Sequence, residues 1–546
     1  MTVGPRPGGV LRLLLAVLVL HLLLAQPNHP AAFTWQALLL FALELPVILL
    51  ALVAASGRIA TALRIVLSVV LTLLVVFKTA DFAMFTALAR GFNPVADLIL
   101  VDAGLRLLSG AIGTVPAVLV ALAAFLATIG IGIAVWWATG VWAAVSPTRA
   151  VAKAASVGAI VLAGLAVAEI GQALGRWSLP FSPPGAAFTA RLGYERVLLM
   201  RNTLIDLRVF RIAATEDPYA KIPGLLDQID SNVLIVFVES YGRTSLDTPF
   251  YADLHRETLN RSEAKLRKLG LSMASGLLTA PTRGGQSWLS HATFANGLWV
   301  NDQTRYGAAL ASGRETLFHI AARSGFRTAV VMPQITLDWP ESEVMGFDTI
   351  LTARDLGYKG APFNWVTMPD QFTLAALDRL VLSEDAGSLV FAQLVLASSH
   401  APWVPVPELV DWNSIGDGRI FNDMAAAGDT PEMVWRDRDR VRLQYRKAID
   451  YSLSAVFAYA ALHADDPALM IILGDHQAAD FVALDDRADV PVHVIGPPHL
   501  VAQIADWGWS AGLIPSSEVP VLGMEQMRDR LIETFSSRLA PAVARD

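Results

Sequence analysis

The segment PALMIILGDHQAAD, residues 467–480, decides the fold, because it joins an uninterrupted apolar run to two reactive side chains. The run from Leu469 to Leu473 is typical of a strand that is buried on both faces of a sheet. It ends at Gly474, and Asp475 and His476 follow at once. An acid and an imidazole at the end of a buried strand predict a functional site at the edge of a sheet.

The composition indicates a membrane protein. Of the 546 residues, 54% are hydrophobic and 17% are charged, which is too apolar for an ordinary water-soluble protein. The net charge of −7 argues against a general nucleic-acid-binding protein, since such proteins present basic surfaces. The chain has no cysteine, which excludes disulfides, thiolate nucleophiles and cysteine metal ligands.

The apolar residues are concentrated in residues 1–175, where we predict an N-terminal all-α transmembrane bundle of five helices. A helix needs about 20 mostly apolar residues to cross a bilayer core. The predicted spans are residues 10–26, 32–55, 60–80, 114–139 and 150–173. The first span has the charged start of a signal peptide, but its end, LLLAQPN, is a poor cleavage site and favours an uncleaved helix.

Lysine and arginine in the loops predict the orientation, because cytoplasmic loops are enriched in both. Basic residues lie before and at the start of the first span, and in or directly after the loops that follow the second and fourth spans, whereas the loop after the first span has none. They are Arg6, Arg12, Arg58, Arg64, Arg149 and Lys153. The loop 81–113 is an exception, with Arg90 and Arg106, and has room for short interfacial helices. Five crossings place the chain beyond about residue 175 outside the cytoplasm, which predicts a multi-pass cell (inner or plasma) membrane protein.

Two acids, Glu44 and Glu169, fall inside predicted spans. An ionisable residue inside a membrane is a candidate functional group, but two acids without a repeat pattern favour a role in helix packing. Residues 176–230 form a predicted connector, in which the Pro-rich RWSLPFSPPG ends the last span. The following YERVLLMRNTLIDLRVFRIA predicts an amphipathic helix with basic residues, suited to a membrane surface.

Residues 231–546 predict one extracytoplasmic α/β domain. Apolar strands alternate with amphipathic helices, which favours a mainly parallel sheet covered by helices on both faces. The predicted strands lie in NVLIVFVES, FRTAVVM, SLVFAQLVLASSH, ALMIILGD and VPVHVIGP. In open α/β sheets, functional side chains gather at the carboxyl ends of the strands.

Three of these strands end in side chains that can bind a metal ion or a phosphate. They deliver Glu239, His400, and the pair Asp475 and His476. Carboxylate oxygen and imidazole nitrogen suit a divalent ion such as Mn²⁺ or Zn²⁺. A single such residue after a strand is more often a cap or a loop residue, but three together favour a functional site.

Ser287 is a candidate nucleophile. It lies in LTAPTRGGQSWLSHATFANGL, where two glycines precede Gln286 and Ser287 and a helical pattern follows. A hydroxyl at a helix start lies near backbone N–H donors that can bind a phosphate, and a metal ion can activate it. The equally open alternative is that Ser287 caps the helix, as serines often do.

The order of these motifs resembles the alkaline phosphatase and sulfatase superfamily: VES at 238–240, the Gly-rich loop with its hydroxyl, SSHAPW at 398–403 and GDH at 474–476. The membrane anchor before it resembles the lipoteichoic acid synthase group, with its phosphoglycerol and phosphoethanolamine transferases. The resemblance implies an alkaline-phosphatase-like α/β domain after the bundle, with a metal ion bound by four residues. These are Glu239, Asp475, His476 and Ser287, the last standing where the family has a threonine nucleophile.

The same resemblance implies that His400 contacts the phosphoryl group and that Trp339 lies in the headgroup pocket. Pro340 and Glu341 stand where the synthases have an asparagine and an arginine, and Met332 and Pro333 stand where they have a histidine. The headgroup pocket is therefore altered, and the transferred group stays open. A formylglycine sulfatase is disfavoured, because residues 287–291, SWLSH, lack the proline and arginine of the Cys/Ser-x-Pro-x-Arg motif.

The sequence therefore predicts a membrane-anchored, metal-dependent phosphotransferase. It would move a phospho-alcohol headgroup from a membrane phospholipid to an envelope glycan or lipid, through a covalent intermediate on Ser287. One divalent ion is expected, with Mn²⁺ favoured and Zn²⁺ or Mg²⁺ as alternatives, and no nucleic-acid partner is expected. A sulfatase-like phosphodiesterase that uses water as acceptor, and a non-catalytic domain that binds a glycan or a partner, are the alternatives.

The remaining histidines and aromatic residues have structural interpretations. His291 and His319 have no identifiable partner in the sequence, and His493 lies in the middle of a strand, which favours a core position. Three tryptophans could line a headgroup pocket, although such residues more often pack in a core. They are Trp365, Trp403 and Trp412.

We expect a reporter fused at the C-terminus to be active only if it is a type that requires export. The physical reason is the bias of Lys and Arg toward the cytoplasmic side together with an odd number of crossings. Paired fusions to an export-dependent phosphatase and to a cytoplasm-dependent fluorescent protein measure this. Fluorescence from the second fusion, with an inactive phosphatase, would place the domain inside and contradict the prediction.

Overall fold

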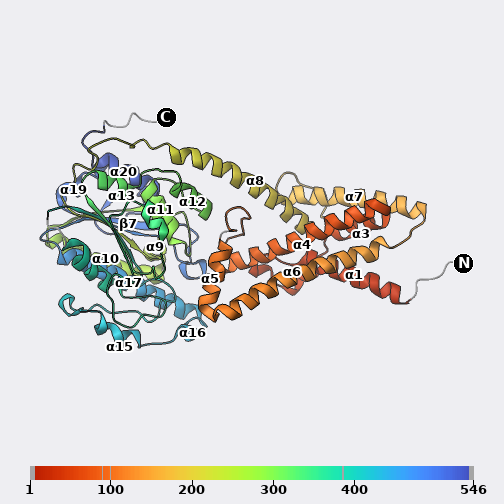
Figure 1. Cartoon of the computed structure of the whole chain (residues 1–546), viewed down its shortest axis with the longest axis horizontal. Helices are drawn as coiled ribbons and strands as arrows, with labels where there is room; N and C mark the ends of the chain where they lie inside the picture. The colour runs from red at the N-terminus through yellow and green to blue at the C-terminus, as the bar shows by residue number, and fades with distance from the viewer. Residues whose placement is uncertain (1–6, 89, 99, 384–386, 540–546) are drawn as a thin grey trace. The chain divides into compact units, whose positions relative to one another are not determined.

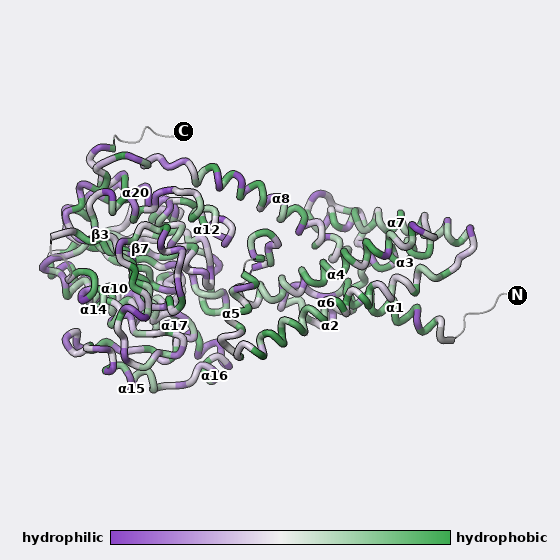
Figure 2. The backbone as a smooth tube through the Cα atoms, in the orientation of Figure 1, coloured by the Kyte–Doolittle hydropathy of each residue, from purple (hydrophilic) through white to green (hydrophobic). Residues whose placement is uncertain are grey.

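The computed structural model describes residues 7–88, 90–98, 100–383 and 387–539. The chain forms two compact units that divide between Asp206 and Leu207 (Figure 1). The helices of the first unit are predominantly hydrophobic along their length, whereas hydrophobic and hydrophilic residues are mixed in the second (Figure 2).

The first unit is helical. Its elements are α1 (Pro7–Ala25), η1 (Pro30–Ala32), α2 (Trp35–Leu38), α3 (Glu44–Ala54), α4 (Gly57–Leu88), α5 (Leu100–Ile112), α6 (Thr114–Ala143) and α7 (Arg149–Ala173). A further helix, α8 (Phe188–Thr215), contains the helix predicted for the connector and continues into the second unit. Among the described residues, three helices are long and apolar enough to cross a membrane, at Gly57–Thr86, Thr114–Ala143 and Arg149–Ala173. Five spanning helices are therefore not confirmed: besides these three, the described residues contain two shorter apolar helices, Gly9–Ala25 and Glu44–Ala54.

The predicted span 32–55 is wrong as a single helix. It is divided into the end of η1, then α2, then α3, whose 11 residues give a length of about 16 Å, short of the roughly 30 Å bilayer core. Pro46 explains the break, because its ring would clash with the carbonyl of residue 42 in a continuous helix. Proline is tolerated in the first turn of a helix, and α3 accordingly begins at Glu44.

The acids in this unit bind the start of a helix. Glu169 Oε2 accepts a hydrogen bond from Ala187 N at 2.9 Å, and Glu44 Oε1 accepts one from Ala190 N at 2.9 Å. Both carboxylates thus satisfy N–H groups at the N-terminus of α8, where a negative charge is favourable. The opposite arrangement occurs at the end of α1, where the fully buried Lys78 donates to the carbonyls of Leu23 and Leu24.

The second unit is built on one nine-stranded sheet. Its strands are β1 (Val233–Val238), β2 (Ser272–Thr279), β3 (Arg327–Met332), β4 (Thr349–Thr352), β5 (Val390–Leu396), β6 (Leu469–Gly474), β7 (Asp489–Gly496), β8 (Ser510–Ala511) and β9 (Val521–Gly523). Their order is β4-β3-β5-β1-β6-β7-β2-β8, with β9 beside β2. The five strands from β4 to β6 are parallel, and β7 and β8 run antiparallel to their neighbours. The expectation of a mainly parallel sheet is confirmed.

Two apolar cores cover the two faces of the sheet. Along β1, Leu234 and Val236 belong to one core, and Ile235 and Phe237 belong to the other. The first core also contains residues of α10 (Pro249–Lys268), α14 (Asp370–Leu377) and α17 (Arg438–Leu462). The second contains residues of α11 (Ser287–Asn296), α13 (Leu317–Arg323) and α20 (Gln526–Thr534). Burial on both faces explains why these strands are continuously apolar in sequence.

A buried chain of hydrogen bonds joins the turn after β1 to strands β7 and β2. Tyr241 Oη lies 3.0 Å from His493 Nε2, and His493 Nδ1 lies 2.8 Å from Ser275 Oγ. Ser275 Oγ donates to Gly512 O at 2.7 Å, so it accepts from His493 Nδ1–H, and His493 Nε2 accepts from the tyrosine. This arrangement requires a neutral His493, and burial lowers its pKa to about 3.

We expect the protein to lose stability as the pH falls below about 6.5, where histidines of the unfolded chain take up protons that the folded chain excludes. Burial lowers the pKa of His255 to about 4 as well, so the loss continues until the pH reaches the folded values. The His493→Gln variant should lose less stability on acidification, because glutamine does not titrate. Its side chain can accept a hydrogen bond from Tyr241 while donating one to Ser275. The measurement is the unfolding temperature of purified full-length protein near pH 7 and near pH 4.5. Equal losses in the two proteins would contradict the assignment of this acid sensitivity to His493.

Candidate functional site

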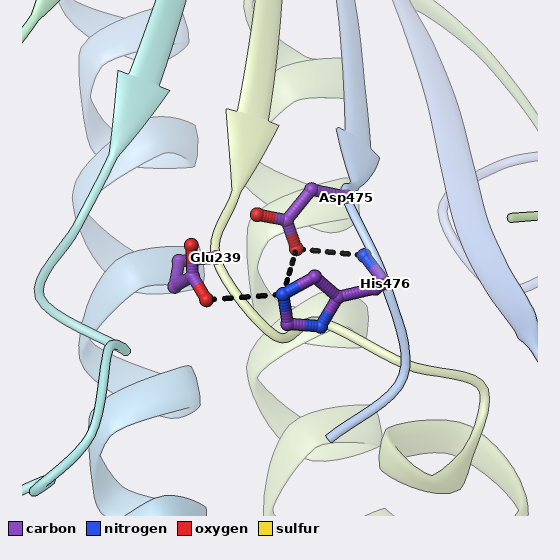
Figure 3. Close-up of side chains that lie close together, drawn as sticks. All are labelled: Glu239, Asp475 and His476. Carbon is purple, nitrogen blue, oxygen red and sulfur yellow. Dashed lines mark hydrogen bonds and ion pairs between the residues drawn. The ribbon is translucent and has the colours of Figure 1, made fainter. Parts of the chain in front are cut away.

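The site is built where two neighbouring parallel strands end at the same level. In the pairing of β1 with β6, Val238 lies opposite Gly474. The next residues, Glu239 and Asp475, therefore leave the sheet side by side, and His476 follows (Figure 3). The strand-end prediction thus corresponds to one physical location, the carboxyl edge of the parallel block.

The three side chains are buried and converge. His476 Nε2 lies 3.3 Å from Glu239 Oε1 and 3.8 Å from Asp475 Oδ1. One ligand atom from each residue lies within 4.8 Å of the others, and this is the only such group found among the described residues. Figure 3 shows both carboxyl groups facing the same ring nitrogen of His476.

Ser287 completes the group from the other side. It is the first residue of α11, and its Oγ donates to Glu239 Oε2 at 2.9 Å and lies 3.3 Å from His476 Nε2. The helix cap is Gln286, which makes no side-chain capping bond. The Ser287 hydroxyl is therefore directed at the acid and the imidazole and not at the backbone of its own helix. The helix-cap interpretation of Ser287 is wrong, and its half-buried side chain keeps access to solvent.

Unusual backbone conformations flank the site residues. Ser240, Gln286 and Trp403 have φ values of 58°, 66° and 59°, a region that costs non-glycine residues about 1–2 kcal/mol. Gly474 is required by close approach, since a Cβ there would lie 1.9 Å from Tyr241 O. The turns after β1 and β6 thus cross at a separation that only glycine permits, which brings Glu239 and Asp475 together.

The electrostatics of the group are dominated by burial. Burial favours neutral Glu239, but the charges of His476 and, more weakly, His400 outweigh it and hold the pKa of Glu239 well below its usual range. Burial and the negative charge of Glu239 raise the pKa of Asp475 well above its usual range. Burial disfavours a charged His476, but the two carboxyl groups outweigh it and raise its pKa to about 9. Without a further cation, the site thus holds one ion pair and one carboxyl group that resists ionisation.

The residues fit a divalent cation. Asp475 Oδ2 is buried and has no hydrogen-bond partner among the described residues, and a cation could coordinate it. His476 Nδ1 lies 3.0 Å from Gln477 O, so Nδ1–H donates there and Nε2 is left as the ligand atom. Two carboxylates, one imidazole and the Ser287 hydroxyl form an oxygen-rich set of the kind that binds divalent metals.

His400 reaches the same edge of the sheet, and Trp339 does not join the group. His400 follows β5, the other neighbour of β1, and its charge contributes to the low pKa of Glu239. Its Nδ1 lies 2.6 Å from Ala401 O, which leaves Nε2 free to face a substrate. Trp339 is partly buried against the second core at the start of η2 (Pro340–Val344), and none of its hydrogen bonds in the described part of the chain reaches the four residues.

The other histidines have structural contacts. His291 is buried against Phe237, and His319 forms a capping box with Thr316 at the start of α13. Of the three tryptophans, Trp403 is 5% exposed. Trp412 packs against the first core, while Trp365 is 72% exposed. The packing interpretation therefore holds for Trp403 and Trp412 but not for Trp365.

Sequence reasoning missed backbone groups that hold the site. Ser240 N donates to Asp475 Oδ1 at 2.8 Å, and Gly284 N donates to Gln477 O at 2.8 Å. The second bond ties the loop before Ser287 to the loop after His476. Any residue supplies such groups, so no side-chain type in the sequence marks them; the glycines at 284 and 285 were the only local signal.

Comparison with known proteins gives similarity to solved structures only. No protein-family model matches the chain, and no curated protein matches it. The integral membrane protein lipooligosaccharide phosphoethanolamine transferase A from Neisseria meningitidis is similar over 96% of both chains, at 12% identity and a TM-score of 0.43. The phosphoglycerol transferase GacH from Streptococcus pyogenes is similar over 61% of this chain and 82% of its own, at 13% identity and a TM-score of 0.35.

The lipoteichoic acid synthase LtaP from Listeria monocytogenes is similar over 53% of this chain and 71% of its own, at 13% identity and a TM-score of 0.35. These are the groups that the sequence resemblance names.

We expect Asp475→Ala to lose the bound metal, because it removes one of two carboxylates and leaves the ion pair of Glu239 and His476 to close the site. Metal content per purified protein, measured by elemental analysis after growth with manganese and zinc, tests this. Asp480→Ala is the matched control, since Asp480 lies five residues further on and pairs with Arg283. Full metal content in Asp475→Ala would show that the ion binds elsewhere.

Proposed function

We propose that the protein is a membrane-anchored phosphotransferase that moves a phospho-alcohol headgroup from a membrane phospholipid to an envelope glycan or lipid. The observation that supports it most is the Ser287 hydroxyl, which bonds to Glu239 and faces His476 although it begins a helix whose N–H groups it could have capped. A half-buried hydroxyl directed at an acid and an imidazole is arranged as a nucleophile.

In the first step, Ser287 Oγ attacks the phosphorus of the lipid phosphodiester. The bond between phosphorus and the diacylglycerol oxygen breaks, and the headgroup remains on Ser287 as a phosphodiester. The hydroxyl proton points at Glu239 Oε2, at 2.9 Å, which orients the oxygen for attack, and that proton is taken up by the departing diacylglycerol oxygen. In the second step, a hydroxyl of the acceptor attacks the same phosphorus, Ser287 leaves and regains its proton.

A divalent ion bound by Glu239, Asp475, His476 and Ser287 would stabilise charge on the phosphoryl oxygens and favour the ionised serine. The oxygen-rich ligand set favours Mn²⁺ over Zn²⁺, with Mg²⁺ a further alternative. His400 is assigned to the phosphoryl group, through Nε2, because Nδ1 is held by Ala401 O. Trp339 is assigned to the headgroup on the family resemblance alone.

The membrane anchor fits a lipid donor. Three helices long and apolar enough to span a bilayer precede the α/β unit in the same chain, so the site remains near the bilayer and meets lipid headgroups at high effective concentration. An outward orientation would give it envelope glycans or lipids as acceptors. Transfer to water would make the protein a phosphodiesterase that shares the first step.

We expect Ser287→Ala to fold, to keep most of its metal and to lose turnover by about two orders of magnitude or more, because the nucleophile is absent. Ser287→Thr should keep part of the activity, since threonine supplies the same hydroxyl. The assay is release of fluorescent diacylglycerol from acyl-labelled phosphatidylglycerol and phosphatidylethanolamine, with mass spectrometry of the Ser287 peptide for the covalent headgroup.

Ser290→Ala is the matched control, because Ser290 lies on the same helix, is fully buried and has an Oγ without a hydrogen-bond partner. It should retain wild-type turnover. Two results together would contradict the covalent mechanism: activity of Ser287→Ala, and no headgroup adduct on Ser287 of the wild-type protein. They would favour direct hydrolysis by water.

A further inference from the structure

We infer that Asp370 is the positioning residue for His400, holding in place the turn from which that histidine faces the site. This inference rests on the proposed function, in which His400 contacts the transferred phosphoryl group. Asp370 is the first residue of α14, which precedes β5 in the chain.

The carboxylate of Asp370 is fully buried and fully engaged. Its Oδ1 accepts hydrogen bonds from Ala397 N at 2.7 Å and Ser398 N at 2.8 Å, and its Oδ2 accepts one from Ser452 Oγ at 2.6 Å. The backbone N–H of Asp370 in turn donates to Ser398 Oγ at 2.9 Å. Three of these four bonds are made to residues 397–398, the turn that directly follows β5.

This turn leads straight to the site. His400 N donates to Ala397 O at 3.0 Å, so the histidine is fixed to the residue that Asp370 holds. Ser399 Oγ donates to Glu239 O at 2.6 Å, which joins the turn to the main chain of a proposed metal ligand. A shift of Ala397 would therefore move His400 relative to Glu239.

The side-chain chemistry explains why an acid occupies this position. The N–H groups of Ala397 and Ser398 are buried, and buried donors need a partner. One carboxylate oxygen can accept from both at once, while the other accepts from Ser452 on α17. If Asp370 served only stability, replacing it would disturb the site no more than replacing another acid of the same unit.

The experiment compares Asp370→Ala and Asp370→Asn with Asp450→Ala in the purified full-length protein. Asp450 is the matched control, because it is a partly buried acid on α17 that accepts from Thr258 Oγ1 on α10 at 2.6 Å. The first readout is the rate at which diethyl pyrocarbonate modifies His400, followed by peptide mass spectrometry. We expect the rate of His400 modification to change at least about threefold in Asp370→Ala. The rate should change less, and in the same direction, in Asp370→Asn, and it should not change in Asp450→Ala.

The second readout is turnover of the acyl-labelled lipids in a double-mutant cycle with His400→Ala. We expect Asp370→Ala to lower turnover about tenfold or more with His400 present, and less than about threefold in the His400→Ala background, because coupled residues are not additive. Additive losses, or an unchanged rate of His400 modification in both Asp370 variants, would overturn the positioning role. If His400→Ala itself leaves turnover unchanged, the proposed role of His400 fails instead, and the modification rates still test whether Asp370 holds it.

Discussion

Burial of two carboxyl groups and an imidazole at the ends of β1 and β6 is the constraint on which the α/β unit depends. An unpaired charge in a protein interior costs several kcal/mol, so each of the three groups needs a partner. His476 lies between Glu239 and Asp475, and Ser287 approaches Glu239 from α11. Asp475 Oδ2 is buried and has no hydrogen-bond partner among the described residues, so a bound cation would satisfy it.

The surrounding backbone is held in costly conformations to achieve this convergence. Ser240 and Gln286 take positive φ values immediately beside Glu239 and Ser287, and Gly474 admits the carbonyl of Tyr241 at a distance that any Cβ would forbid. Such conformations persist only where surrounding structure fixes them. Here the apolar cores cover both faces of the sheet, and Ser240 donates through its N–H to Asp475 Oδ1 and accepts at its carbonyl from Tyr445 Oη.

The helical unit follows the same rule for buried charge. Glu44 and Glu169 bind the first N–H groups of α8, and Lys78 binds the last carbonyls of α1. Each charge lies at the helix end of opposite polarity, where free backbone groups need partners. These three charged residues are therefore explained by helix ends.

Local sequence pattern is enough to predict the central strands of the sheet and the residues that follow them. Continuous apolar runs identify β1, β3, β5, β6 and β7, because burial on both faces leaves no polar alternation. The acids and histidines of the site are found directly after three of these strands. Hydropathy alone could not divide residues 32–55, where Pro46 forces a new helix start. Only the tertiary structure decided the role of Ser287, since a serine at a helix start looks the same in sequence whether it caps that helix or faces Glu239, 48 positions away. That choice depends on strand register and on the crossing of two turns at Gly474, which are long-range contacts that no local pattern encodes.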